Sequence, residues 1–286
     1  QAAPRKTQSA RHWSQQRESG SGGGAGIQLL LFIHRVFGRG IFRVCLYPVM
    51  TYFFLRQRRA RDASRTFLLA AHRQGSKALK RAPTWRDSFR HFYAFGEALL
   101  DKLLAWSGRI NTDTIDFPQR EQLQQQLRGG RGVVLVGAHL GNLELIRAIA
   151  HQQYLRVQAV YFTENALQFQ AQLHKQHPDV AKDVIAVSEM GPDTAMRLRA
   201  AIDRGEILVI VGDRTSVKHR ERSVMVNFLG RPAPFAIGPW VLASLLECPV
   251  NLFFCVRDGE RHRVLLETFS TPILRLERAR RQQHLQ

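Results

Sequence analysis

The residues of this chain best suited to chemistry are His139 and Glu144, which lie in the segment GAHLGNLEL, residues 137–145. A histidine can take a proton from a hydroxyl or an amine near neutral pH, and a carboxylate can hold the proton on its other ring nitrogen. Residues five apart point in different directions on a continuous helix, so their meeting requires a turn, for which Gly141 supplies the backbone freedom. If the two side chains meet, they form a catalytic dyad. The competing interpretation, which is favoured for an isolated motif of this kind, is that His139 caps a helix and Glu144 lies in its first turn, where acidic side chains are favoured anyway.

A strand and a following helix must position this pair. Short apolar runs predict strands at 132–138, 157–162, 184–187, 207–211, 250–256 and 264–268, and helical spacing predicts helices at 143–153, 167–175, 193–204 and 237–247. The alternation predicts an α/β fold, in which a mostly parallel central sheet is flanked by helices. In such sheets, functional groups gather beyond the carboxyl ends of the strands, where His139 falls.

The N-terminal region has a different composition. Residues 1–26 are polar and basic and end in a run of glycine and serine, which is typical of a flexible lead-in. Residues 27–61 are apolar but carry Arg39 and Arg43 in their middle, which disfavours a single membrane span. We predict two short helices in the headgroup region of a membrane, with arginine side chains reaching toward phosphates. The competing interpretation is a helical hairpin packed on the catalytic domain.

The charge balance predicts an anionic partner. The chain has 42 Lys and Arg against 23 Asp and Glu, a net charge of +19, which fits nucleic acid, an anionic membrane surface or an acidic carrier protein. No nucleic-acid-binding module is recognisable, and no G-x-S-x-G segment supports a serine nucleophile. The three cysteines lack metal-ligand spacing and are expected to be buried, so neither a metal site nor a disulfide framework is predicted.

Several blocks together resemble a known family. The segment with His139 and Glu144 resembles the H-x-x-x-x-D/E block of the lysophospholipid acyltransferase superfamily, and more closely that of the bacterial lipid A late acyltransferases. The likeness runs from about Ile27 to the end of the chain. It includes LVIVGDR at 208–214, NFLGRPAPF at 227–235 and CPV at 248–250. Each block is common alone, whereas their order and spacing are specific to the family.

This resemblance implies a sandwich like that of glycerol-3-phosphate acyltransferase, with residues 62–286 as the catalytic domain, truncated at its C-terminus. The enzyme would move a fatty acyl group from an acyl carrier protein or coenzyme A thioester to a lipid acceptor. It would act at the cytoplasmic face of a bacterial inner membrane, as a peripheral or monotopic protein. His139 would be the general base and Glu144 its orienting partner. A thioester is already activated, so no metal, cofactor or covalent acyl-enzyme is expected. The alternative is an inactive membrane adaptor with the same fold.

Further residues in these blocks are candidates for substrate binding. Asp213 and Arg214 follow a predicted strand, and Arg214 could stabilise an oxyanion or bind an acceptor phosphate. The competing interpretation is a structural ion pair. Arg231 lies in a proline-rich loop that is expected to form a rigid rim and could face an anionic ligand, although a solvated side chain is the simpler interpretation. Asn142 and Asn165 are the remaining candidates for substrate binding.

The acceptor is left open by one departure from the family. Late lipid A acyltransferases place an arginine and then an asparagine after the second strand, whereas this chain has YFTEN at 161–165, which keeps Asn165 and lacks the arginine. This departure counts against a lipid A precursor as the acceptor. Another amphiphile, such as a pigment, a polyene or an amino-acid lipid, fits the sequence at least as well.

Overall fold

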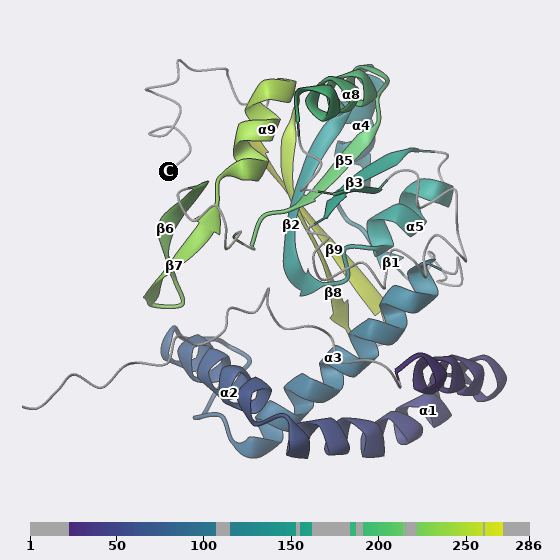
Figure 1. Ribbon diagram of the computed structural model, residues 1–286, viewed down its shortest axis with the longest axis vertical. Helices are drawn as coiled ribbons and strands as arrows, with labels where there is room; N and C mark the ends of the chain where they lie inside the picture. The colour runs from purple at the N-terminus through teal and green to yellow at the C-terminus, as the bar shows by residue number, and fades with distance from the viewer. Residues whose placement is uncertain are drawn as a thin grey trace, which may run out of the picture.

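The computed structural model describes residues 23–106, 115–152, 155–161, 184–186, 191–213, 215, 222–259 and 261–270. Figure 1 shows a sheet with helices on both faces and, at the other end of the long axis, a group of three helices. These are α1 (Gly23–Arg56), α2 (Arg58–Arg73) and α3 (Trp85–Trp106). The expected helix at 167–175 lies outside the described residues, as do residues 1–22 of the predicted lead-in.

Seven strands form the central sheet, in the order β1-β9-β8-β2-β5-β3-β4. Strands β8, β2, β5, β3 and β4 run parallel, β9 is antiparallel to β8, and β1 is parallel to β9. The strands are β1 (Ile115–Asp116), β2 (Val133–Gly141), β3 (Val157–Tyr161), β4 (Val184–Ala186), β5 (Ile207–Val211), β8 (Val250–Asp258) and β9 (Arg261–Ser270). The predicted mostly parallel α/β sheet is thus confirmed.

Helices cover both faces of the sheet because the side chains of β2 alternate between two cores. Val133 and Leu135 face a cluster with α4 (Arg120–Arg128) and α5 (Leu145–Gln152). Val134 and Val136 face a second cluster with α8 (Pro192–Asp203) and α9 (Gly238–Leu246). Each cluster also holds one buried cysteine, as expected, whereas Cys45 of α1 is only partly buried. Burial raises the pKa of Cys248 to about 11 and that of Cys255 to about 12, so both remain thiols.

The segment expected to be a rigid loop is instead a hairpin. Strands β6 (Ser223–Phe228) and β7 (Arg231–Ala236) pair antiparallel, and both prolines of the segment lie inside β7. Proline cannot donate a ladder hydrogen bond, but a two-stranded hairpin has no second neighbour to require one. The sequence prediction of a loop was wrong here because prolines are compatible with a strand that has only one neighbour.

The first helix is bent and lies on α3. Gly38 has φ of 75°, so α1 is two helical segments joined at a kink, in agreement with the two helices expected. Its contact with α3 is made by Phe42, Leu46 and Met50, whereas many of its other large apolar side chains are exposed. Within the described residues, no helix has both the length and the hydropathy needed to cross a membrane.

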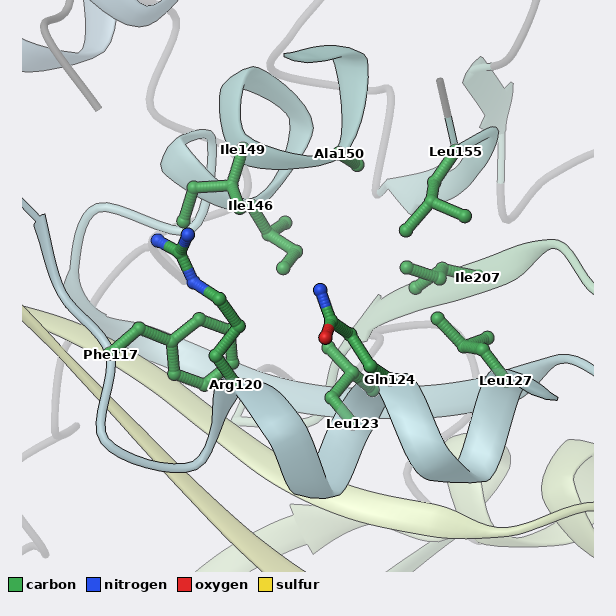
Figure 2. A pocket seen from close by; sticks show the side chains of 10 residues that line it. All are labelled: Phe117, Arg120, Leu123, Gln124, Leu127, Ile146, Ile149, Ala150, Leu155 and Ile207. Atoms are coloured by element: carbon green, nitrogen blue, oxygen red, sulfur yellow. The ribbon is translucent and has the colours of Figure 1, made fainter. Parts of the chain in front are cut away.

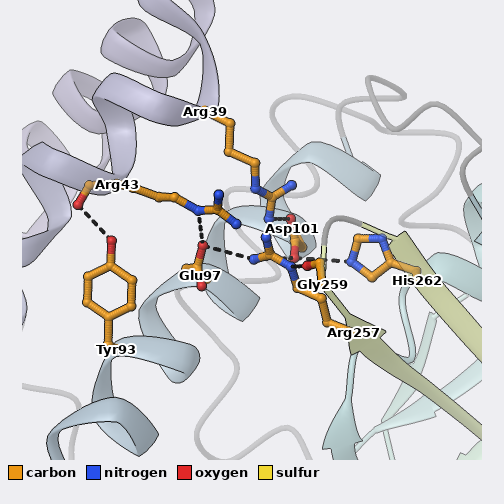
Figure 3. A network of polar contacts seen from close by, with 8 residues as sticks. All are labelled: Arg39, Arg43, Tyr93, Glu97, Asp101, Arg257, Gly259 and His262. Carbon is orange, nitrogen blue, oxygen red and sulfur yellow. Dashed lines mark hydrogen bonds and ion pairs between the residues drawn. The ribbon is translucent and has the colours of Figure 1, made fainter.

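Two arginines in the middle of α1 differ from the prediction. Arg39 pairs with Asp101 of α3 at 2.6 Å, and Arg43 pairs with Glu97 of α3 at 2.7 Å, so both point into the molecule instead of toward phosphates (Figure 3). Arg257 of β8 reaches the same two carboxylates, at 3.8 Å and 3.0 Å respectively. The network therefore joins α1, through α3, to the carboxyl end of β8. This packing agrees with the competing interpretation of a helical unit attached to the catalytic domain.

Candidate active site

A histidine and an aspartate meet at the carboxyl ends of two neighbouring parallel strands. His139 lies near the end of β2, and Asp213 follows β5. The Nδ1 atom of His139 is 2.8 Å from Oδ1 of Asp213, and the backbone N–H of His139 donates to Oδ2 at 2.8 Å. One carboxylate therefore holds both the ring and the main chain of the histidine. This double contact fixes the direction in which the imidazole points.

The turn after His139 is held by the neighbouring strand. Gly141 has φ of 80°, and a Cβ there would lie 1.9 Å from the carbonyl oxygen of Cys255 in β8. That carbonyl accepts a hydrogen bond from the backbone N–H of Asn142 at 2.7 Å. The pairing of β2 with β8 shifts register between Gly137 and Gly141, which marks a bulge. The glycine turn predicted from the sequence is thus present, and it ends the strand beside the histidine.

The electrostatics of the pair leave one ring nitrogen available. Burial alone would raise the pKa of Asp213, but the hydrogen bonds from His139 lower it overall, so Asp213 is a carboxylate at neutral pH. A carboxylate can only accept, and the proton therefore stays on Nδ1 of His139. The Nε2 lone pair can then take a proton from a substrate, to which the histidine is open because its side chain is 46% exposed.

Glu144 does not take the place that was expected for it. It lies in the turn before α5, is 3% exposed, and its backbone N–H donates to Oδ1 of Asn142 at 3.2 Å. Among the described residues, His139 forms its side-chain hydrogen bond with Asp213 and not with Glu144. The reason is that β2 stays extended as far as Gly141. Glu144 consequently lies beyond the end of the strand, and its side chain is buried in the interior.

The other candidate residues are spread more widely. Asn142 is buried and holds the turn through its contact with Glu144, while Arg231 is exposed at the start of β7. Arg214 and Asn165 lie outside the described residues. Asp213 was expected to bind substrate, and the structure gives it a histidine partner. The signal for this pairing was present in the sequence, because an acidic residue lies two positions after a buried strand, and parallel strands end at one edge.

A second histidine–aspartate pair, which sequence analysis missed, lies in the network of Figure 3. Nε2 of His262 in β9 is 3.1 Å from Oδ2 of Asp101 in α3, and both side chains are almost fully buried. Burial would raise the pKa of Asp101, but its contacts with His262 and Arg39 lower it overall. Buried carboxylates of this kind are paired because an isolated buried charge is costly. This pair is closed to substrate.

An apolar cavity between α4 and α5 is not part of the active site. Figure 2 shows its lining, which includes Phe117, Leu127, Ile149 and the first residue of β5, Ile207. Its volume is about 10 Å³, close to the space taken by one water molecule. Because it contacts the start of β5, it lies at the amino ends of the parallel strands, opposite the histidine. Elsewhere in the described part of the chain, no three His, Cys, Asp or Glu side chains gather as metal ligands.

Comparison with known proteins assigns the chain to a family. The model of the bacterial lipid A biosynthesis acyltransferases matches residues 28–279, which include α1, the sheet, the hairpin and the histidine–aspartate pair. A search of curated proteins gives no match to the chain. The matched range covers most of the 286 residues and agrees with the resemblance seen in the sequence blocks. The chain therefore belongs to the bacterial lipid A biosynthesis acyltransferase family.

Proposed function

We propose that this protein transfers a fatty acyl group from a thioester to a hydroxyl group of a lipid A-like acceptor, with His139 as the general base. The observation that carries the proposal is the double contact of Asp213 with His139 at the carboxyl ends of β2 and β5. It leaves an exposed imidazole nitrogen with a fixed direction in a chain of an acyltransferase family. The family description supports the lipid acceptor and the acyl donor.

The chemistry needs one base and balances without further reagents. Nε2 of His139 takes the proton of the acceptor hydroxyl as its oxygen attacks the thioester carbonyl carbon. The tetrahedral intermediate then collapses, its carbon–sulfur bond breaks, and the imidazolium returns the proton to the departing sulfur. The products are an ester and a free thiol. Asp213 stabilises the positive charge that His139 carries between the two steps, because its carboxylate remains hydrogen bonded to Nδ1.

The two carboxylates near the histidine then have separate tasks. Asp213 orients the ring directly, through contacts of 2.8 Å to Nδ1 and to the backbone N–H of His139. Glu144 is the acidic residue of the family block, and we propose that it acts on the shape of the turn from the interior, where its N–H binds Asn142. Asp213 is therefore the stronger candidate for the orienting role first expected of Glu144.

A membrane surface explains the apolar face of α1. Large apolar side chains are exposed along this helix, including Phe32, Phe37, Val44 and Tyr52. Such a face is favourable where it can enter the boundary between headgroups and acyl chains. The carboxyl end of β8 points toward the same helices, because Arg257 binds α3. We propose that α1 lies in the cytoplasmic leaflet of the bacterial inner membrane and that the acceptor reaches His139 from there.

Lipid mass spectrometry tests the proposal directly. Cells that lack the protein are supplied with the full chain or with His139→Ala, and lipid A is extracted and analysed for added acyl groups. We expect one additional acyl chain only with the unchanged protein. If His139→Ala restores the same lipid species, the assigned base is wrong. If acylation appears on another amphiphile, the acceptor is wrong while the transfer chemistry stands.

A further inference from the structure

A cationic surface lies where the C-terminal end of α2 meets the β6–β7 hairpin. We call it the α2–hairpin junction and define it by Arg73, Lys77, Lys80 and Arg231, all of which are exposed. The hairpin turn contacts α2, since a Cβ on Gly230 would lie 2.4 Å from the side-chain nitrogen of Gln74, the residue that follows α2. The junction is thus built from two segments that lie far apart in the sequence.

The turn that carries two of these cations, Lys77 and Lys80, is held in place, and the described residues include no acidic partner for the four. The ring of His72 bonds to the carbonyl oxygen of Leu79 at 2.8 Å, which ties the turn carrying both lysines to the end of α2. Residues 72–83 and 222–236 contain no Asp or Glu. Within the described residues, none of the four junction cations pairs with an acidic side chain. Four fixed positive charges without partners favour an acidic ligand.

The hairpin also connects the junction to the active site. Strand β7 begins at Arg231 and leads into α9, whose Pro239 lies close to Gly212, the residue before Asp213. Gly212 in turn donates its N–H to the carbonyl of Gly137 in β2, two residues before the histidine. From the junction, the chain therefore runs along β7 and into α9, which contacts the segment that carries Asp213.

The spread of the cations over two segments helps to select the ligand. An acyl carrier protein is strongly acidic and presents its thioester at the end of an extended phosphopantetheine arm. Its folded body can cover cations spread over two elements, whereas the phosphates of coenzyme A form a compact group that needs a pocket. A membrane surface would not require the connection that β7 and α9 make between the cations and the segment of Asp213. The geometry thus favours the carrier protein over both alternatives.

We propose that the α2–hairpin junction is the docking site of an acidic acyl carrier protein, from which the thioester reaches along β7 to His139. The inference rests on the proposed acyl transfer. Complementary charge across such an interface acts mainly by bringing the partners together and fixing their orientation. The junction consequently governs how efficiently the carrier-bound donor is used, while the chemical step belongs to His139 and Asp213.

The test uses the full chain with a double charge reversal, Lys77→Glu with Arg231→Glu, and three donors: acyl carrier protein thioester, acyl-coenzyme A and acyl-pantetheine. The kcat/KM for the carrier donor, divided by that for acyl-pantetheine, is expected to fall about tenfold. The matched control reverses two exposed cations outside the junction, Arg156→Glu before β3 with Arg197→Glu in α8, and keeps the ratio. Thermal unfolding of both variants confirms that they are folded.

Each other outcome contradicts a different step. An unchanged ratio overturns the docking site while leaving acyl transfer intact. An equal fall for acyl-coenzyme A overturns the choice of a carrier protein, because the junction then binds phosphate groups common to both donors. Lost binding to phosphatidylglycerol vesicles, with unchanged use of the carrier donor, assigns the junction to the membrane instead. If the unchanged chain transfers acyl groups from none of the donors, the proposed function itself fails, and the docking site with it.

Discussion

The molecule contains two histidine–aspartate pairs with similar geometry and opposite surroundings. In the first, His139 is 2.8 Å from Asp213, and the side chains are 46% and 27% exposed. In the second, His262 is 3.1 Å from Asp101, and the side chains are 6% and 2% exposed. The residue types alone cannot separate the two pairs. Their exposure decides which histidine a substrate can reach.

Their neighbours differ as well. Asp213 directs both of its oxygens to His139, so the histidine keeps a fixed direction with one ring nitrogen for substrate. Asp101 contacts three cationic or basic side chains, those of His262, Arg39 and Arg257 (Figure 3). Each of the three lies in a different helix or strand. A carboxylate that contacts a single histidine orients that histidine for proton transfer. A carboxylate that contacts three such side chains instead holds their helix and strands together. The comparison predicts that the first pair controls rate and the second controls stability.

The largest effect is expected from His139→Ala. Removal of the base should lower kcat by about 10⁴-fold, the upper range for general base catalysis. The free energy of unfolding should hardly change, because the side chain is half-exposed. Steady-state acyl transfer and urea unfolding measure the two quantities. His262→Asn is the control, whose folded molecules should retain kcat; an equal loss of kcat in both variants would remove the distinction between the pairs.

Asp213→Asn should have the next largest effect. An amide can donate to Nδ1, which favours the wrong tautomer of His139, and kcat should fall by about 10³-fold. Glu144→Gln is the matched variant, because it makes the same chemical change at the acidic residue of the family block. It should lower kcat much less than Asp213→Asn does. The reverse order would restore Glu144 as the orienting partner.

Asp101→Asn should act on stability. It leaves Arg39, Arg257 and His262 around a neutral amide, and breaking a buried ion pair in this way costs about 3 kcal/mol. Urea unfolding measures the loss, and activity is compared per folded molecule. A variant that keeps its stability but loses kcat would show that the buried pair takes part in catalysis.

The smallest effect is expected with pH. The pKa of Asp101 is lowered in the folded state, below the ordinary aspartate value of 3.8, through its contacts with His262 and Arg39. The resulting stability is fully present above that ordinary value and is lost as the pH falls through the lower, folded value. The difference in unfolding free energy between the unchanged chain and Asp101→Asn should therefore be constant from pH 7 to 5 and shrink below about pH 4. A difference that shrinks between pH 7 and 5 would contradict this assignment.

Much of the sheet could be predicted from local patterns. Buried parallel strands appear in the sequence as short apolar runs, and the run at 207–211 matches β5 at both ends. The position of His139 at a strand end followed from the same pattern. The hairpin could not be predicted, because the prolines in β7 suit an unpaired strand edge that only the assembled structure reveals.

The partners of the charged residues were harder to predict. The pairing of His139 with Asp213 depends on β5 lying beside β2, although β3 and β4 come between them in the sequence. Likewise, Arg39 and Arg43 have the same local sequence whether they meet lipid phosphates or Asp101 and Glu97. Their partners lie more than 50 residues away. The spacing of residues in the sequence can identify a reactive side chain, but its partner is determined by the topology of the fold.

The bulge at the end of β2 has a consequence for how such an enzyme could be altered. Leu140 and Gly141 directly follow His139, yet they tolerate substitution in opposite ways. Leu140 is 56% exposed, so its side chain could be exchanged to suit a different acceptor. Gly141 admits no side chain, because its φ is positive and a Cβ would overlap the main chain of Cys255. In directed evolution of acceptor preference, Leu140 can therefore be varied, whereas the adjacent Gly141 must be kept.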